Sequence, residues 1–501
     1  MADIRIHRAK KNIAVSLGCQ LVTLICGITV PKLMLDAFGS EVYGATTSIA
    51  QLLSYIALLE GGIGGVARAV LYKPLANGDD ETLNAILDEV KRFFRVIALV
   101  FLLYVLVIAA SFKSISRLET LDWASSFLLV VVISISTLGQ YFIGISNSIL
   151  LQAAQKAYVT NLVNIAGTVI NTAMIVVLIS LRCNIIVVKL ASSIVFAIKP
   201  VVLWIYVKHN YPIHRVNRRG KRYLTQKWTG LGQHVAYFLH SNTDVVVLTC
   251  LLDLKAVAVY SVYNMVISNI QNIAASFVSG MEALFGDMLA KKEDARLNVT
   301  FGMYETIGSV VGVMLFSVTC VMILPFIRIY TAGMTDADYE APLFALLMIL
   351  SALVYVLRMP YHSMVIAAGH FRQTQLAAYG EAIINVILSV LLVTRMGLAG
   401  VAIGTIAATS FRLIYYVIYL SRNLLKRRIS LFVKRSCVNA IAFVAVCLVG
   451  SKVTGFFSIT NYGTWMLCGG VTAIIALMVC GTVNLLYYRQ DCMKLIRRRS
   501  C

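Results

Sequence analysis

The chain has 501 residues, of which 59% are hydrophobic and only 13% are charged, and its formal net charge is +21. A water-soluble protein of this length needs more polar surface than this composition provides, so the composition excludes that class. Runs of about 18 or more apolar residues recur along the whole length, and each can cross a bilayer core of about 30 Å. We therefore expect an all-α, polytopic membrane protein.

About fourteen membrane spans are expected. The first follows a basic start, MADIRIHRAKK, which resembles the beginning of a signal peptide. The apolar run after it is too long for a signal sequence and no small-residue cleavage site follows, so we expect a retained span. In chain order the spans are 13–35, 43–70, 93–112, 123–149, 158–180, 184–207, 231–252, 257–285, 303–327, 341–368, 374–394, 398–420, 436–450 and 463–487.

Lysine and arginine divide unequally between the loops of this topology. With a cytoplasmic N-terminus, the cytoplasmic segments hold 30 of the 44 basic residues and the outer loops hold 7. The positive-inside rule then predicts that both termini are cytoplasmic. The basic segments 208–227 and 421–435 are expected to lie against anionic membrane lipids. Nucleic-acid binding, the other interpretation of basic runs, is not expected because these runs lie between spans.

No motif of a cofactor, metal or nucleotide site stands out. The eleven cysteines are scattered singly, without a CxxC pair or a Cys/His cluster, so we interpret them as small buried apolar residues. No Walker, GxGxxG or HExxH sequence occurs in a suitable setting. We expect no cofactor, no metal and no ATP-driven step.

The chain contains an internal repeat. Four pairs of segments match in the same order and at nearly one offset along the chain. They are LMLDAFGSEVYG (33–44) with CLLDLKAVAVYS (250–261), LANGDDETLN (75–84) with LAKKEDARLN (289–298), Ile170-Asn171 with Ile384-Asn385, and KPVVLWIYV (199–207) with RLIYYVIYL (412–420). Each match alone is weak, but the common order and offset indicate a duplicated half.

The repeat predicts two six-helix lobes. The expected parts are an N-lobe (1–207), a basic cytoplasmic linker (208–230), a C-lobe (231–420), and a last part (421–501) with a basic loop, spans 13 and 14 and a cytoplasmic tail. Because six is an even number of spans, both copies have the same orientation, and their pseudo-twofold axis is expected along the membrane normal. A site is then expected near mid-membrane between the lobes of an alternating-access transporter.

On these features the sequence resembles the polysaccharide flippases of the multidrug/oligosaccharidyl-lipid/polysaccharide (MOP) exporter superfamily. The resemblance rests on fourteen spans with a basic tail and on VPKLMLDAFGSEVYG, LLEGGIGGVARAVLYKPLA and NTDVVVLTCLLDLKAVAVYSVYN. It implies a multi-pass protein of a bacterial inner membrane. The implied task is to flip undecaprenyl-diphosphate-linked oligosaccharides from the cytoplasmic to the outer face, for polysaccharide biosynthesis.

Cations within spans are candidates for binding a diphosphate, which needs positive charge. Lys199 and Arg412 each lie about 22 Å into their span at 1.5 Å per residue, and they are equivalent in the repeat, so they are expected to flank a central cavity. Arg358 and His362 lie one turn apart on the tenth span. The alternative for these cations is a static pair with a buried carboxylate.

Uncharged polar residues complete the expected cavity. Asn171 and Asn385 are equivalent in the repeat, and Tyr260 and Asn264 lie one turn apart on the eighth span. These side chains suit contacts with sugar hydroxyls. They equally suit hydrogen bonds between neighbouring helices, and the sequence leaves both interpretations open.

Four carboxylates are candidates for ion coupling or gating. Asp244 lies mid-span, where a short carboxylate must pair, bind a cation or be protonated, so we expect it to couple H⁺ or Na⁺ or to hold a lobe-closing salt bridge. Glu381 lies one turn before Asn385. Glu60, in LLEGGIGGVARA, and Glu282 lie near the cytoplasmic ends of equivalent spans. We expect Glu60 to pair across the lobe interface when a cytoplasmic gate closes, with static helix packing as the alternative.

Two other functions compete with the flippase. An ion-coupled multidrug or small-molecule exporter of the same superfamily would favour an acidic, aromatic-rich cavity, whereas mid-span cations favour an anionic lipid head. A membrane glycosyltransferase or polymerase would need a catalytic constellation on a substantial outer loop. The outer loops are short and carry only a few acids, such as Asp336, Asp338 and Glu340. We therefore expect a transporter and not an enzyme.

Overall fold

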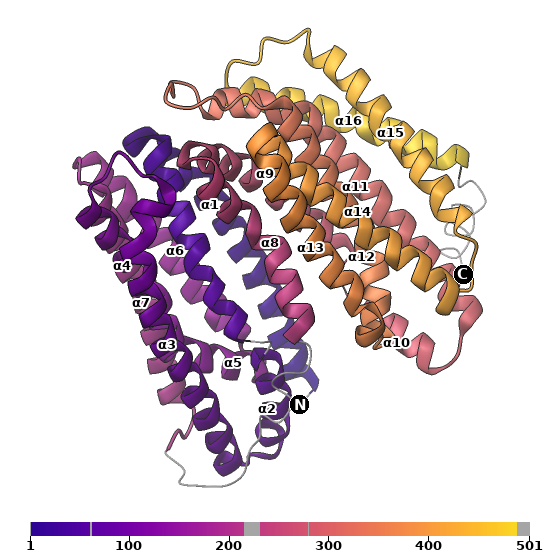
Figure 1. Ribbon diagram of the computed structural model, residues 1–501. Coiled ribbons are helices and arrows are strands. Elements are labelled where there is room, and N and C mark those ends of the chain that lie inside the picture. The colour runs from indigo at the N-terminus through magenta and orange to yellow at the C-terminus, as the bar shows by residue number, and fades with distance from the viewer. Residues whose placement is uncertain (1, 61–62, 215–230, 279, 488–501) are drawn as a thin grey trace. The chain divides into compact units, whose positions relative to one another are not determined.

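The computed structural model describes residues 2–60, 63–214, 231–278 and 280–487 (Figure 1). Every regular element in these ranges is a helix, which confirms the all-α class. Twelve of the described helical runs are long and apolar enough to cross a membrane, and the first of them, Lys11–Glu60, holds the first expected span and most of the second. Parts of the expected linker (215–230) and tail (488–501) lie outside the described residues.

The chain forms two compact units. Unit 1 comprises residues 1–238 and 253–258, and unit 2 comprises residues 239–252 and 259–501. The lobe limits expected from the repeat stay predictions, as does the axis that relates the lobes.

Unit 1 contains a 3-10 helix and a π-helical segment among its α-helices. The elements are α1 (Ala2–Ser54), η1 (Tyr55–Glu60), α2 (Ile63–Asn77), α3 (Asp80–Ser116), α4 (Trp123–Gly139), η2 (Gln140–Gly144), α5 (Ile145–Ala153), α6 (Ala157–Ser180) and α7 (Ile185–Asn210). Side-chain caps fix several starts, because they satisfy N–H groups that lack a helical partner. The Asp79 carboxylate accepts from the Thr82 N–H at the start of α3. Within α1, Gly39 has a φ of 78°, so α1 is two helices joined at a break.

Unit 2 has a similar order of helices and two more at its end. The elements from residue 231 onward are α8 (Leu231–Leu251), α9 (Leu254–Val278), α10 (Glu282–Ala290), α11 (Asp294–Tyr330), α12 (Pro342–Ala367), α13 (Phe371–Met396), α14 (Leu398–Asn423), α15 (Ser430–Thr454) and α16 (Tyr462–Tyr487). The part of α8 up to residue 238 and the part of α9 up to residue 258 belong to unit 1. The seventh expected span, 231–252, coincides with α8. The expected span 257–285 lies within the run Leu254–Ala290, in which α9 ends at Val278 and Gly280, with a φ of 93°, precedes α10.

The helix boundaries follow the repeat. Helices α3 and α11 have the same length, and their starts and their ends are separated by one and the same offset. The starts of α6 and α13 are separated by the same number of residues. For α7 and α14 the separation is one residue shorter, both between their starts and between their ends. Left-handed backbone conformations recur at the same spacing, at Gly78 and Lys292 and at Gln155 and Gly369. The two units therefore place the same turns at equivalent points of the chain.

Helix α3 has one apolar face in the protein core and another on the protein surface. One of its faces is buried in the unit 1 core, where Phe94, Phe101 and Phe112 are almost fully enclosed. The opposite face is also apolar and exposed, and Leu103 and Val107 are 66% and 58% accessible. An apolar stripe of this kind is unfavourable in water and favourable against lipid, so α3 has the surface of a membrane-spanning helix.

Candidate functional site

Unit 1 contains a cavity of about 440 Å³ lined by polar and aromatic side chains. Its wall includes residues from η1, η2 and four α-helices: Glu60, Ser136, Thr137, Gln140, Tyr141, Ile145, Asn164, Phe196 and Lys199. Of these, the sequence predicts Lys199 as a binding residue and Glu60 as a gating residue. The polar residues of α4 and η2 are not among the predicted site residues, although their Ser-Ile-Ser-Thr-Leu-Gly-Gln sequence interrupts an apolar span.

Lys199 provides the positive charge of this cavity. Its Nζ lies 4.2 Å from the centre of the Phe196 ring, a distance at which a cation is attracted to the aromatic face. Gly167 on α6 makes room for the lysine, because a Cβ at that position would overlap the Lys199 methylenes. Among the described residues, Lys199 forms no ion pair.

Glu60 contributes a carboxylate to the same cavity. It is the last residue of η1, and its Oε1 accepts a hydrogen bond of 2.5 Å from the Tyr141 hydroxyl. Tyr141 lies in the π-helical segment η2, so the bond joins two irregular stretches within unit 1. The expected partner across the lobe interface stays a prediction, and the partner seen here belongs to the same unit as Glu60.

In unit 2, three predicted residues form one buried ionic cluster. Glu381 on α13 is fully buried, and it accepts hydrogen bonds from Arg358 on α12 and Arg412 on α14. Arg412 also donates to the Tyr416 hydroxyl at 3.0 and 2.9 Å. The His362 ring stacks on Tyr416, with 6.0 Å between ring centres and 7° between the planes. The cluster thus satisfies both arginines inside unit 2, which is the pairing that the sequence left open as the alternative.

The repeat makes Lys199 and Arg412 directly comparable. Arg412 has Glu381 beside it, whereas the residue 214 positions before Glu381 is Gly167. The residue 214 positions before Arg358 is likewise a glycine, Gly144. Unit 2 therefore neutralises its cation with a carboxylate, whereas unit 1 has a glycine at the equivalent place, against which the Lys199 side chain packs.

Asp244 lies in a second polar cluster of unit 2. It is 5% exposed, and its Oδ2 accepts a hydrogen bond of 3.1 Å from the Tyr260 hydroxyl. The Thr405 hydroxyl lies 3.1 Å from the same oxygen and accepts from the Asn385 amide at 3.0 Å. Within the described part of the chain, the Oδ1 atoms of Asp244 and Asn385 are buried without a hydrogen-bond partner. Buried oxygens in this state are costly, so the cluster has the capacity to hold a proton or a cation.

Three remaining candidates lie apart from these clusters. Asn171 on α6 is buried, and its Oδ1 has no hydrogen-bond partner among the described residues. Asn264 is half-buried on α9, while Tyr260, its expected companion, is bound to Asp244. Glu282 is exposed and is the first residue of α10, within the helical run Leu254–Ala290 that is long and apolar enough to cross a membrane, and its gating role stays a prediction.

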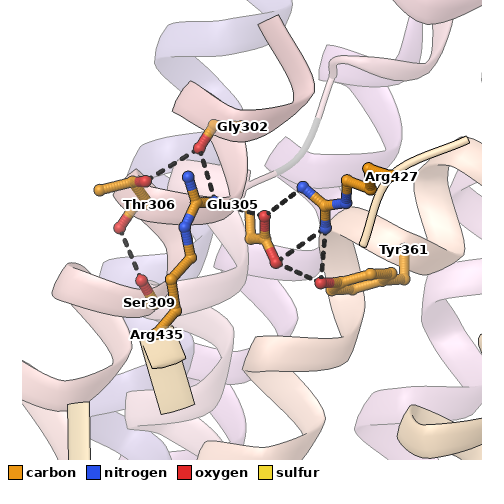
Figure 2. Close-up of polar contacts among 7 residues, drawn as sticks. All are labelled: Gly302, Glu305, Thr306, Ser309, Tyr361, Arg427 and Arg435. Atoms are coloured by element: carbon orange, nitrogen blue, oxygen red, sulfur yellow. Dashed lines mark hydrogen bonds and ion pairs between the residues drawn. The ribbon is translucent and has the colours of Figure 1, made fainter. Parts of the chain in front are cut away.

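A further shared carboxylate, Glu305, is not among the residues predicted from the sequence. It accepts two hydrogen bonds from Arg427, at 2.8 and 3.0 Å, and further bonds from Arg435 and the Tyr361 hydroxyl (Figure 2). Glu305 lies on α11, Arg435 on α15, and Arg427 in the segment between α14 and α15. The cluster therefore fastens α15 to the core of unit 2. Its signals in the sequence are the position of Glu305 inside the expected span 303–327 and the basic run 421–435, whose charge is also explained by topology.

Comparisons with known proteins identify the fold. No protein-family model and no curated protein sequence matches the chain. Among solved structures, the lipid II flippase MurJ in an inward closed conformation matches with a TM-score of 0.67 and 13% identity, over 96% of this chain and 99% of that one. An inward-facing MATE multidrug transporter of the MOP superfamily matches with a TM-score of 0.56 and 15% identity, over 84% and 99% of the two chains. The chain shares the fold of these two transporters.

The MOP fold also occurs in a eukaryotic MATE transporter, with a TM-score of 0.56, 12% identity, and 88% and 99% of the two chains covered. The resemblance noted in the sequence is confirmed at the level of the fold. A lipid flippase and multidrug transporters share this fold, so the fold alone does not assign a function.

Proposed function

We propose that this protein is a flippase for lipid-linked oligosaccharides. It moves undecaprenyl-diphosphate-linked repeat units from the cytoplasmic to the outer face of a bacterial inner membrane, by alternating access of its two lobes, and both of its termini are cytoplasmic. The observation that carries the proposal is the positive charge of Lys199 in the unit 1 cavity, which forms no ion pair among the described residues. A half-buried lysine without an ion pair is unfavourable in a membrane protein unless an anion binds to it.

The wall of the cavity suits the head of such a substrate. Lys199 offers a cation to a diphosphate oxygen. Ser136, Thr137, Gln140 and Asn164 offer hydroxyl and amide groups to sugars. Gly167 supports the assignment, because a carboxylate at its place would neutralise the lysine as Glu381 neutralises Arg412.

We further propose that the Asp244 cluster binds the coupling ion, either H⁺ or Na⁺. Carboxylate, amide and hydroxyl oxygens from Asp244, Asn385 and Thr405 are hard ligands of the kind that small cations prefer. Binding there would join α8, α13 and α14, and this would give the ion a way to favour one conformation of unit 2. Substrate binding by Arg358, Arg412 and His362 stays a prediction, since it requires the Glu381 cluster to open.

An exporter of cationic molecules is the second candidate function. One observation favours it: Glu60 gives the same cavity a carboxylate. The two candidates differ in the residue on which transport depends, Lys199 for an anionic lipid head and Glu60 for a cationic substrate.

The test is translocation of a fluorescent undecaprenyl-diphosphate oligosaccharide in proteoliposomes. Lys199→Gln should lower substrate affinity about 10- to 100-fold, the equivalent of a charged hydrogen bond of about 1.5 to 3 kcal/mol. Lys199→Arg should retain most of it. Lys208→Gln is the matched control, because Lys208 lies near the end of the same helix and is exposed.

Two results would overturn the proposal. If Lys199→Gln and Lys208→Gln both match the wild type, the cavity lysine does not bind the substrate. If the wild type moves no lipid-linked sugar but moves cationic dyes, and Glu60→Gln abolishes that movement, the protein is an exporter.

A further inference from the structure

Three cations of unit 1 lie around a single turn, the α5–α6 turn (residues 152–158). Arg68 on α2 donates a hydrogen bond of 2.9 Å to the Gln152 side chain. The Nζ of Lys11 on α1 lies 4.1 Å from the centre of the Tyr158 ring. Lys156 belongs to the turn itself. We call Lys11, Arg68 and Lys156 the basic turn cluster.

Aromatic rings hold the two lysines of this cluster in place. Lys11 lies over the Tyr158 ring, as given above. The Nζ of Lys156 lies 4.9 Å from the ring centre of Tyr211, just beyond the end of α7, and 5.9 Å from that of Tyr206, near the end of α7. Cation–π contacts of this length fix the ammonium groups without neutralising them. Tyrosines are also residues that gather at the level of lipid headgroups.

The turn that carries the cluster is itself fixed. Asn12 on α1 donates to the Gln155 carbonyl at 3.0 Å and accepts from the Tyr158 N–H at 2.8 Å. Gln155 adopts a left-handed conformation with a φ of 59°. The cluster is therefore assembled before any ligand arrives, so binding would cost little conformational entropy.

The basic turn cluster lacks an ionic partner among the described residues, because none of its three members is part of an ion pair there. Two cations of unit 2 on the side predicted to be cytoplasmic are paired, in contrast. Lys291 pairs with Asp287 at 2.8 Å, and Arg296 pairs with Glu293 at 3.1 Å. Three fixed, unbalanced charges repel one another, and an anion bound between them would relieve that repulsion.

We propose that the basic turn cluster binds the phosphate of an anionic phospholipid of the cytoplasmic leaflet. The ligand chemistry is a phosphate diester at the membrane surface, in contact with two ammonium groups and a guanidinium. Exposure favours a lipid over the diphosphate of a transported substrate, because Lys11 and Arg68 are exposed and none of the three residues lines the unit 1 cavity. The bound lipid bridges α1, α2 and α6.

The test compares the purified protein in nanodiscs of phosphatidylcholine with and without phosphatidylglycerol. The readouts are the Tm of unfolding and the number of phosphatidylglycerol molecules retained in native mass spectrometry. The variant is Lys11→Gln/Arg68→Gln/Lys156→Gln. The control, Lys291→Gln/Lys292→Gln/Arg296→Gln, removes the same charge from exposed residues around the start of α11.

Phosphatidylglycerol should raise the Tm of the wild type and the control, and the basic turn cluster variant should lose this rise and bind the lipid at least about 10-fold more weakly. Equal retention by both variants would overturn the proposal. Inorganic pyrophosphate is added in a separate arm: if it raises the Tm in phosphatidylcholine alone and displaces the lipid, the cluster is a diphosphate site and not a phospholipid site. Should the triple variant unfold in phosphatidylcholine alone, Lys156→Gln with Lys156→Arg as its rescue gives the same comparison.

Discussion

Replacing Glu305 by glutamine should destabilise unit 2 more than its single lost charge suggests. Glu305 is the acceptor for Arg427, Arg435 and Tyr361, and the side chains of the two arginines are only 12% and 13% exposed. Glu305→Gln removes the negative charge that two enclosed guanidinium groups share. Breaking a buried ion pair from one side costs about 3 to 5 kcal/mol. Because these arginines retain some exposure, we expect the lower end, about 3 kcal/mol.

The assay is equilibrium unfolding of the detergent-solubilised protein in a series of denaturing detergent mixtures. Glu340→Gln is the matched control, since Glu340 accepts two hydrogen bonds from Arg328 but both side chains are at least half exposed. The Arg328 guanidinium holds the pKa of Glu340 below its usual range, yet water competes for this pair and no measurable loss is expected. A variant with leucine at Glu305, Arg427 and Arg435 should recover much of the loss, because it leaves no buried charge. If Glu305→Gln is as stable as Glu340→Gln, the account of the cluster as an enclosed charge network is wrong.

Two further predictions concern single positions. Asp244→Asn should leave the fold intact and make translocation insensitive to imposed Na⁺ or pH gradients in proteoliposomes. The control is Asp253→Asn, because Asp253 is exposed and caps α9 through the Ala256 N–H, and this variant should keep that sensitivity. Equal behaviour of the two variants would remove Asp244 from the coupling site. Gly44→Ala should cost at least about 2 kcal/mol of stability, because a Cβ there would overlap the Leu254 carbonyl, which is backbone and cannot move aside. The control is Gly64→Ala, which should be neutral or stabilising because no atom lies within 4 Å of the added Cβ. A Gly44→Ala protein with wild-type Tm would show that this close packing is absent.

The sequence predicts the elements of this fold better than its contacts. Apolar runs and the nearly constant offset of the repeat predict helices such as α3 and α11, because span length and the turns between spans are local properties. The break at Gly39 and the π-helical segment η2 are not predicted, since each depends on how neighbouring helices pack.

The contacts of the candidate site are likewise not predicted from the sequence. Arg358 and Arg412 are predicted from their position in spans, but their shared partner Glu381 lies on another helix, α13. Which helix face each of them occupies is decided by tertiary packing. One signal for the unit 1 cavity is present in the sequence: the repeat offset leads from Glu381 to Gly167, and Gly167 lacks the carboxylate that would neutralise Lys199.

The pairing of Gly167 with Glu381 has an evolutionary consequence. Glycine and glutamate codons can differ by a single nucleotide, so one point mutation at position 167 could add the carboxylate that the first half lacks. Such a change would add a second carboxylate, besides Glu60, to the cavity that holds Lys199, and its side chain would have to displace the Lys199 methylenes. Among descendants of the same duplicated gene, the residue at this position should therefore vary with the charge of the transported molecule, while Glu381 stays as part of the scaffold.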